Sequence, residues 1–252
     1  MKAYKVAKYN VNSLKKSVCI YYSIFIAVYI FLVILSRIYN DSFATAGTEL
    51  SSAIAIFIVG LNIFKENFYF MKSNNVSRKS YFLGTVLSML PIAITMSVID
   101  IIINRAYNLF FKCPTNYDMI FTDFSNGADI TMATSNWVQG NDILTLFNTF
   151  LFQASLYLML FALGFVITMV YYKCNKLMKT VVSISPVMLF MLFGVLVSNF
   201  PYAAQKVLEF LFYIFGITPR NVYIAILTFI ILFIALVTAA YLLVRKMIIK
   251  EK

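Results

Sequence analysis

The stretch "VYIAILTFIILFIALVTAAYLLV", residues 222–244, decides the class of fold. It is predominantly apolar and contains no charged side chain. A helix needs about 20 such residues to cross the hydrocarbon core of a bilayer. The run does not alternate between polar and apolar residues, as a strand of a membrane barrel does. It therefore predicts a membrane-spanning helix, because a helix satisfies its own backbone hydrogen bonds in lipid.

Five further runs have the same character, and the composition agrees with them. Of the 252 residues, 62% are hydrophobic and 12% are charged, whereas soluble chains carry about 25% charged residues. We therefore predict an all-α polytopic membrane protein with six transmembrane helices. The predicted spans are residues 18–38, 51–71, 81–103, 144–172, 181–199 and 222–244.

The charged residues divide unequally between the connecting segments. Residues 1–17, 72–80, 173–180 and 245–252 together hold 15 basic residues and one acid. The other loops, residues 39–50, 104–143 and 200–221, hold four basic residues and seven acids. The positive-inside rule places the basic segments in the cytoplasm, so we expect both termini there. The net charge of +11 then reflects topology, and no nucleic acid partner is needed to explain it.

Three segments outside the spans have a character of their own. Residues 1–17 place apolar residues at helical spacing among lysines, which predicts an amphipathic helix on the inner membrane surface; a frayed basic tail is the alternative. Residues 104–143 form a long loop rich in aromatic and turn-forming residues. They predict a small ordered external cap, or an elaborated loop without a direct role. Residues 200–216 are too polar for a span and predict an interfacial or re-entrant helix.

A few polar residues fall within the predicted spans. The apolar part of the second span ends near Phe64, and Lys65 and Glu66 follow. Glu66 either marks the membrane interface or, together with Asn62, faces a polar transport pathway. Asp100 lies near the outer end of the third span, where we expect it to mark the interface. Asn148 and Gln153 lie close to the start of the fourth span, so neither predicts a deep site.

The chain lacks the residues that several kinds of chemistry require. The chain has no histidine, which removes His-dependent metal sites, Ser-His dyads and HExxH proteases. None of its eight glycines is followed by lysine, so it contains no P-loop for ATP. Its three cysteines fall in different segments and predict no disulfide framework. We expect no enzymatic activity in this chain.

The stretch "FYFMKSNNVSRKSYFLGTVLS", residues 68–88, joins the second and third predicted spans. On its residues alone it is a basic turn that anchors the topology, in which Ser77 can cap a short helix that begins at Arg78. The stretch also resembles the corresponding loop of ABC-2-type transporter permease subunits of Gram-positive peptide and antimicrobial exporters. Asn75 stands where glycine is commoner in that family, and asparagine tolerates the left-handed turn conformation.

The resemblance implies a partner and a docking site. In that family the loop forms a coupling helix that rests on a separate ABC ATPase, which binds ATP and Mg²⁺. Carried over to this chain, the coupling residues are Lys72, Asn75, Val76, Ser77, Arg78 and Lys79. The loop 173–180 would supply a secondary cytoplasmic contact through Lys173, Lys176 and Lys179.

The resemblance also implies how the chain would work. It would be the permease of an ATP-driven exporter in the bacterial cytoplasmic membrane, paired with a second copy of itself or with a related permease. We expect amphipathic or hydrophobic peptides, such as toxins or antimicrobials, as its cargo.

Two other functions stay open on the sequence. A non-transporting membrane immunity or resistance protein would need no ATPase contact. An ion-coupled carrier would predict internal repeats and ionisable residues at the bilayer midplane. The chain has no clear repeat, and Lys65 and Glu66 are its nearest approach to a central charge.

Overall fold

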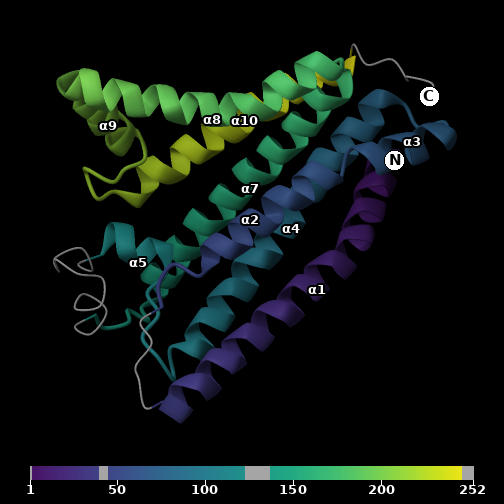
Figure 1. The fold of residues 1–252 in the computed structure, drawn as a ribbon. Helices are drawn as coiled ribbons and strands as arrows, with labels where there is room; N and C mark the ends of the chain where they lie inside the picture. Colours follow the sequence, from purple (N-terminus) through teal and green to yellow (C-terminus); the bar gives the residue numbers. More distant parts are fainter. Residues whose placement is uncertain (1, 40–44, 123–136, 246–252) are drawn as a thin grey trace.

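The computed structural model describes residues 2–39, 45–122 and 137–245, except for the side chains of Lys2, Ser36, Tyr39, Lys65, Glu66 and Lys72. All the regular elements within these ranges are helices (Figure 1). They are α1 (Lys2–Tyr39), α2 (Glu49–Asn62), α3 (Lys65–Ser73), α4 (Arg78–Tyr107), α5 (Asn116–Phe121), α7 (Ile143–Lys173), α8 (Lys176–Asn199), α9 (Pro201–Ile214) and α10 (Val222–Arg245).

Five of these helices are long and apolar enough to cross a membrane: α1, α4, α7, α8 and α10. The architecture is therefore that of a multi-pass helical membrane protein. The second predicted span, residues 51–71, differs from the prediction because α2 ends at Asn62 and a turn separates it from α3. The 14 residues of α2 rise only about 21 Å, which is shorter than a hydrocarbon core of about 30 Å.

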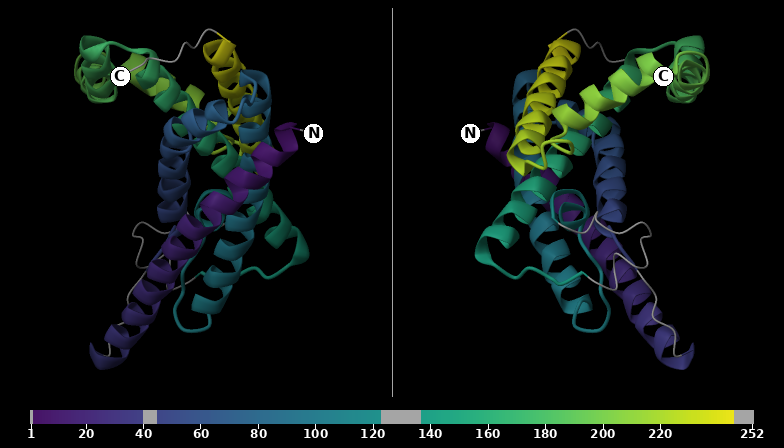
Figure 2. Two further views of the ribbon diagram at one scale, coloured as in Figure 1. Left: turned by 90° about the vertical axis from the view of Figure 1, so that its right-hand side faces the viewer. Right: turned by 90° about the vertical axis from the view of Figure 1, so that its left-hand side faces the viewer.

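Helices α1, α2, α4 and α7 lie side by side in an inclined bundle, and α10 packs against α7 (Figure 1). Helix α7 packs against α2, α4 and α10, while α1 packs chiefly against α4. We call the end where α1 begins, α3 lies and α10 ends the terminal end. The opposite end, where α2 begins and α5 lies, is the distal end. The start of α1 and the end of α10 lie at the same end of the bundle in Figures 1 and 2.

The predicted boundary between an interfacial helix, residues 1–17, and a first span does not exist in the structure. Residues 2–39 form one continuous helix. Val6 and Ala7 are buried, and the backbone at Gly84 of α4 approaches Val6 so closely that a Cβ there would lie 2.5 Å from its Cβ. Of the apolar residues at helical spacing, Ala7 is buried and Val11 and Leu14 pack against the main core, whereas Tyr4 is exposed.

Helices α2 and α7 approach each other through two glycines. A Cβ on Gly60 would lie 2.4 Å from the carbonyl oxygen of Phe161, and a Cβ on Gly164 would lie 2.4 Å from that of Phe57. Such contact between backbones is typical of helix pairs in membranes, where small residues permit close packing. The main core forms around this contact, with Ile56, Met89 and Phe161 among its fully buried side chains.

Helix α8 packs very differently from the other long helices. None of its residues is buried, and its main neighbour is α9. Helix α9 matches the short helix predicted over residues 200–216 and begins with Pro201, a residue favoured in the first turn. Both helices stand at the side of the molecule opposite α1 (Figure 1).

Candidate functional site

The first candidate site is helix α3, which lies across the terminal end between α2 and α4 (Figures 1 and 2). The sequence becomes polar at Lys65 and Glu66, and a continuous span would carry both into hydrocarbon, where a charge costs several kcal/mol. A crosswise helix avoids this cost and still buries Phe64, Phe68 and Met71 on one face. The spacing of these three side chains, i, i+4 and i+7, is that of one helical stripe.

An aromatic cluster fastens this stripe to the bundle; we call Phe64, Phe68, Tyr81, Phe165 and Tyr172 the terminal aromatic cluster. The ring of Phe68 lies 5.4 Å from that of Tyr81 in α4 and 6.1 Å from that of Tyr172 in α7. Phe64 contacts Tyr172 and Phe165 edge-on at 5.5 and 6.0 Å. The Tyr81 hydroxyl donates to the carbonyl of Phe64 at 3.2 Å. Helix α3 is therefore in contact with both α4 and α7.

Helix α3 also contacts the beginning of α1. The rings of Tyr9 and Phe70 stack with their centroids 5.1 Å apart. The Asn67 amide donates to Asn10 at 3.3 Å, and the Asn10 amide donates to Thr85 of α4 at 3.3 Å. A displacement of α3 would thus act on three helices at once.

The turn from α3 to α4 contains most of the residues predicted to dock an ATPase. Asn75 has φ +54°, the left-handed conformation that its residue type tolerates. Ser77 is the N-cap of α4 and accepts from the Ser80 amide at 3.2 Å. Lys79 is exposed, and Val76 and Arg78 are half-buried. The prediction of a separate short helix after Ser77 is wrong: the helix that begins at Arg78 is the whole of α4, and the short helix precedes the turn.

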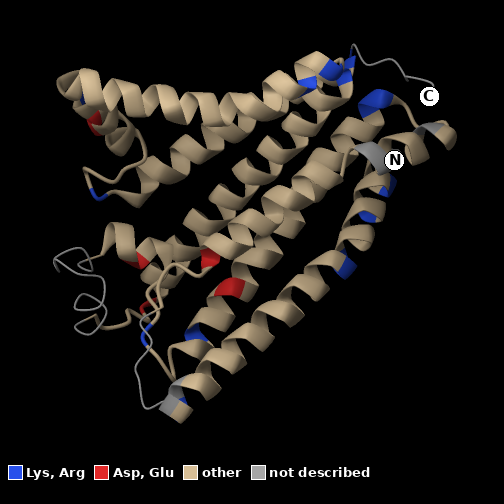
Figure 3. Cartoon of the chain, viewed as in Figure 1, with Lys and Arg blue, Asp and Glu red and all other residues tan. Residues whose placement is uncertain are grey.

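The remaining predicted site residues lie at the same end. Lys173 ends α7, and Lys176 and Lys179 belong to the first turn of α8, all three exposed. Basic residues gather at this end of the bundle (Figure 3). Asn62 is exposed and donates to the Ile58 carbonyl within its own helix at 3.0 Å. The side chains of Glu66 and Lys72 lie outside the described residues.

The second candidate site is the carboxylate of Asp100, which the sequence analysis expected only to mark the membrane interface and which the structure places inside the bundle. Asp100 of α4 is 2% exposed. Its Oδ1 accepts from the Tyr22 hydroxyl of α1 at 2.9 Å and from the Ser52 hydroxyl of α2 at 2.8 Å. Its Oδ2 accepts from the Tyr157 hydroxyl of α7 at 2.5 Å. We call these four residues the Asp100 node, and they join four helices.

Further hydroxyls and carbonyls surround the Asp100 node. Tyr22 also donates to the Met96 carbonyl at 3.0 Å, and Tyr21 bonds Ser52 at 2.9 Å. Hydrogen bonds are directional and strong in a low-dielectric interior. The node therefore fixes the relative rotation of the four helices more tightly than apolar contacts alone would.

An ordered cap covers the distal end beside the Asp100 node. Thr115 and Asp118 form a capping box at the start of α5, and the amide of Asn116 donates to Glu49 Oε2 at 3.3 Å. Asn104 and Asn108 both donate to the Cys113 carbonyl at 3.0 Å. The predicted cap within residues 104–143 thus has an ordered part over residues 108–122; residues 123–136 lie outside the described residues.

Two carboxyls of the cap are deeply buried. Glu49, which precedes the apolar run of α2, is 2% exposed, and burial raises the pKa of its carboxyl to about 8. Burial also raises the pKa of the Asp118 carboxyl, although its hydrogen bonds with Thr115 oppose the shift. Within the described residues, Glu49 Oε1 and both amide atoms of Gln153 are buried without a hydrogen-bond partner.

Comparison of the chain with protein-family models, with curated proteins and with solved structures gave no match.

Proposed function

We propose that this chain is the membrane-spanning subunit of an ATP-driven exporter of the ABC-2 type. The observation that carries the proposal is the crosswise helix α3, tied by ring contacts to α1, α4 and α7 and followed by the basic turn with Arg78 and Lys79. A transporter driven by a separate motor needs such an element, since force must pass from an exposed surface into several spans at once.

In this proposal the terminal end faces the cytoplasm of a bacterial cell, in agreement with the positive-inside rule. A separate ATPase that binds ATP and Mg²⁺ docks on α3 and the turn at residues 74–79. Arg78 pairs with a carboxylate of that subunit, for which its planar guanidinium is suited. Lys173, Lys176 and Lys179 supply a second contact. This chain contributes no catalytic residue to ATP hydrolysis.

The conformational step follows from the two candidate sites. ATP binding draws the two ATPases together and displaces α3. The terminal aromatic cluster transmits the displacement to α4 and α7, and the stacked rings of Tyr9 and Phe70 transmit it to α1. The Asp100 node holds α1, α4 and α7 together deeper in the bundle. The helices then shift between inward-open and outward-open arrangements, as packed elements with two stable states do.

The cargo and the pairing complete the proposal. A second copy of the chain, or a related permease, supplies the other wall of the transport path. The exposed side chains of α8 and α10 are mainly aliphatic or aromatic, which suits an amphipathic or hydrophobic peptide, such as a toxin or an antimicrobial, as cargo.

The direct test is purification of the tagged chain from its native cells in mild detergent. Arg78→Glu is compared with Lys206→Glu, a matched charge reversal at an exposed lysine of α9. We expect a stoichiometric Walker-motif ATPase with the wild type and with Lys206→Glu, and its loss with Arg78→Glu. If no ATPase copurifies and Arg78→Glu changes nothing, the turn is a topology anchor and an immunity-type function replaces the proposal.

A further inference from the structure

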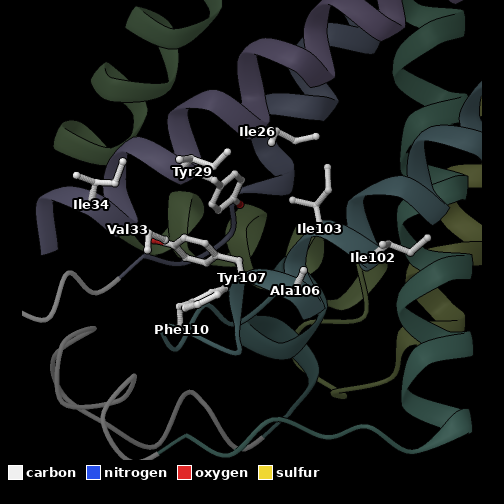
Figure 4. A pocket seen from close by; sticks show the side chains of 10 residues that line it. Ile26, Tyr29, Val33, Ile34, Ile102, Ile103, Ala106, Tyr107 and Phe110 are labelled. Atoms are coloured by element: carbon white, nitrogen blue, oxygen red, sulfur yellow. The ribbon is translucent and has the colours of Figure 1, made fainter. Parts of the chain in front are cut away.

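An apolar groove lies between the distal parts of α1 and α4. The two helices diverge toward the distal end (Figure 2). They leave a groove of about 370 Å³ between them, which falls within the roughly 300–1,000 Å³ of typical small-ligand sites. Figure 4 shows its walls, with Ile26, Tyr29 and Val33 on α1 and Ile103, Ala106 and Phe110 at the end of α4.

The chemistry of this groove, which we call the α1–α4 groove, is that of hydrocarbon. All its lining side chains are aliphatic or aromatic. The rings of Tyr29 and Tyr107 meet edge-on at 4.3 Å and form a rigid floor. A void in such a wall loses dispersion contacts on one side. The hydroxyls of Tyr29 and Tyr107 are buried and do not line its open surface, so a polar ligand would find no accessible hydrogen-bond partner there. A flexible alkyl chain would fill the void and needs no hydrogen-bond partner.

The position of the groove indicates the source of the alkyl chain. Its walls belong to two helices that are long and apolar enough to span a membrane, and several neighbouring side chains of α1, such as Ile30 and Ile34, are more than half exposed. The groove is therefore open to the lipid along its length. The surrounding bilayer supplies alkyl chains at very high local concentration.

The basic residues near the distal mouth of the groove indicate the charge of the lipid headgroup that would lie there. Arg37 lies one helical turn beyond the lining residue Ile34, and Lys112 lies two residues beyond the lining residue Phe110. Both side chains are exposed. Long basic side chains at the ends of spanning helices reach to the level of the headgroups.

We propose that the α1–α4 groove binds one acyl chain of an anionic phospholipid, whose headgroup lies between Arg37 and Lys112. The bound chain joins the distal half of α1 to α4, where α1 has few protein contacts of its own. The proposal rests on the membrane-spanning architecture alone, and it stands whether or not the chain binds an ATPase.

The test uses the full chain in nanodiscs of phosphatidylcholine that contain a trace of phosphatidylglycerol with a photoreactive group in its acyl chain. After irradiation, the labelled peptides are quantified by mass spectrometry. We expect adducts concentrated on residues 26–34 and 102–110, relative to the exposed helix α8. Ala106→Phe fills the groove, and we expect it to lower these adducts about tenfold, as a loss of about 1.4 kcal/mol of binding free energy would.

Two controls separate the groove from general lipid contact and from misfolding. Ala235→Phe enlarges an exposed alanine of α10 and is expected to leave the labelling unchanged. Ile102→Trp fills the groove from an exposed position, so it reports on the same site if Ala106→Phe fails to fold. Adducts at the same density on α8 and on the groove, or adducts that neither filling variant lowers, would overturn the proposal.

The headgroup is tested by a phosphatidylcholine probe with the same photoreactive chain. We expect several-fold fewer groove adducts than with phosphatidylglycerol, and we expect Arg37→Gln with Lys112→Gln to abolish the difference. Equal labelling by the two probes in the wild type would overturn the choice of an anionic lipid.

Discussion

The terminal aromatic cluster and the Asp100 node both hold α4 and α7, but through two different kinds of contact. Ring contacts of Phe64 and Phe68 join the start of α3 to α4 and α7 at 5.4–6.2 Å, and such contacts permit small sliding movements at little cost. The node joins α1, α2, α4 and α7 by hydrogen bonds of 2.5–2.9 Å to one carboxylate. Since hydrogen bonds depend steeply on geometry, the node resists the movements that the cluster allows.

Ring contacts at one end and hydrogen bonds deeper inside would let one helical bundle combine a movable end with a fixed point. In the proposed mechanism, a displacement of α3 at the terminal end would pass to α4 and α7 through contacts that tolerate it. These helices would pivot about the buried carboxylate deeper in the bundle. Substitutions in the two regions are therefore expected to differ in their effects.

The largest effect is expected at the Asp100 node. Asp100→Ala removes three hydrogen bonds worth about 1 kcal/mol each and leaves a cavity where four helices meet. We expect the free energy of unfolding in detergent to fall by about 3–4 kcal/mol in total. Thr95→Ala is the control on the same helix, because this exposed threonine bonds only the Pro91 carbonyl among the contacts found. Equal stability of the two variants would contradict the assigned role of the node.

The next effect concerns the glycine contact of α2 with α7, which lies between the two regions. Gly164→Val places a side chain against the backbone of α2, so we expect a loss of about 1–3 kcal/mol from overpacking. Gly194→Val is the matched control in α8, since a Cβ there meets no atom within 4 Å. Thermal unfolding of both variants measures the difference. A loss with Gly194→Val as large as with Gly164→Val would contradict the packing described.

A smaller and pH-dependent effect is expected at Glu49. The pKa of its carboxyl in the folded protein, about 8, lies above the ordinary value of 4.5. The folded state therefore binds the proton more tightly than the unfolded state does, and stability falls as the pH rises from about 4.5 to 8. In the wild type, we expect the free energy of unfolding to fall by on the order of one to a few kcal/mol over this pH window. We expect Glu49→Gln to abolish this fall. Thermal unfolding at pH 5, 6.5 and 8 measures it, and identical pH profiles of the two proteins would refute the assignment.

The smallest effect on stability is expected at the terminal aromatic cluster. Phe68→Leu keeps an apolar side chain of similar size, so we expect it to cost less than about 1.5 kcal/mol. It removes the ring contacts with Tyr81 and Tyr172, however, so we expect transport to fall while ATPase binding is retained. Leu87→Phe is the control, because it changes the number of aromatic rings at an exposed position of α4 outside the cluster. Unimpaired transport by Phe68→Leu would remove the cluster from the mechanism.

The sequence predicted the helices well where composition alone determines them. Residues 81–103, 144–172 and 222–244 lie within α4, α7 and α10, because a helix satisfies the backbone hydrogen bonds of an apolar run in lipid. Helix α4 continues through Pro91, although proline removes one backbone donor. The left-handed conformation of Asn75 was also predictable, since few residue types tolerate it.

Where tertiary packing decides, the sequence predicted less. The break at Asn62 depends on whether Lys65 and Glu66 remain in the same helix as the apolar run, and local periodicity does not decide this. The continuity of α1 depends on the space that Gly84 offers to Val6. Both features follow from contacts between elements that are far apart along the chain.

The Asp100 node was the main site that the sequence missed. Its three hydroxyl donors lie 78, 48 and 57 residues from Asp100 along the chain. An acid within a predicted span was the available signal. The predicted end of that span at residue 103 placed Asp100 near the interface, whereas α4 continues to Tyr107 and leaves the carboxylate deeper in the helix.

The most direct test of the central claim is site-specific photo-cross-linking at the turn between α3 and α4. A photoreactive amino acid replaces Lys79 in one variant and Lys206 of α9 in another, and both are irradiated in native cells. We expect an adduct with a Walker-motif ATPase at position 79 and none at position 206. The absence of an ATPase adduct at position 79, with the variant correctly inserted in the membrane, would contradict it.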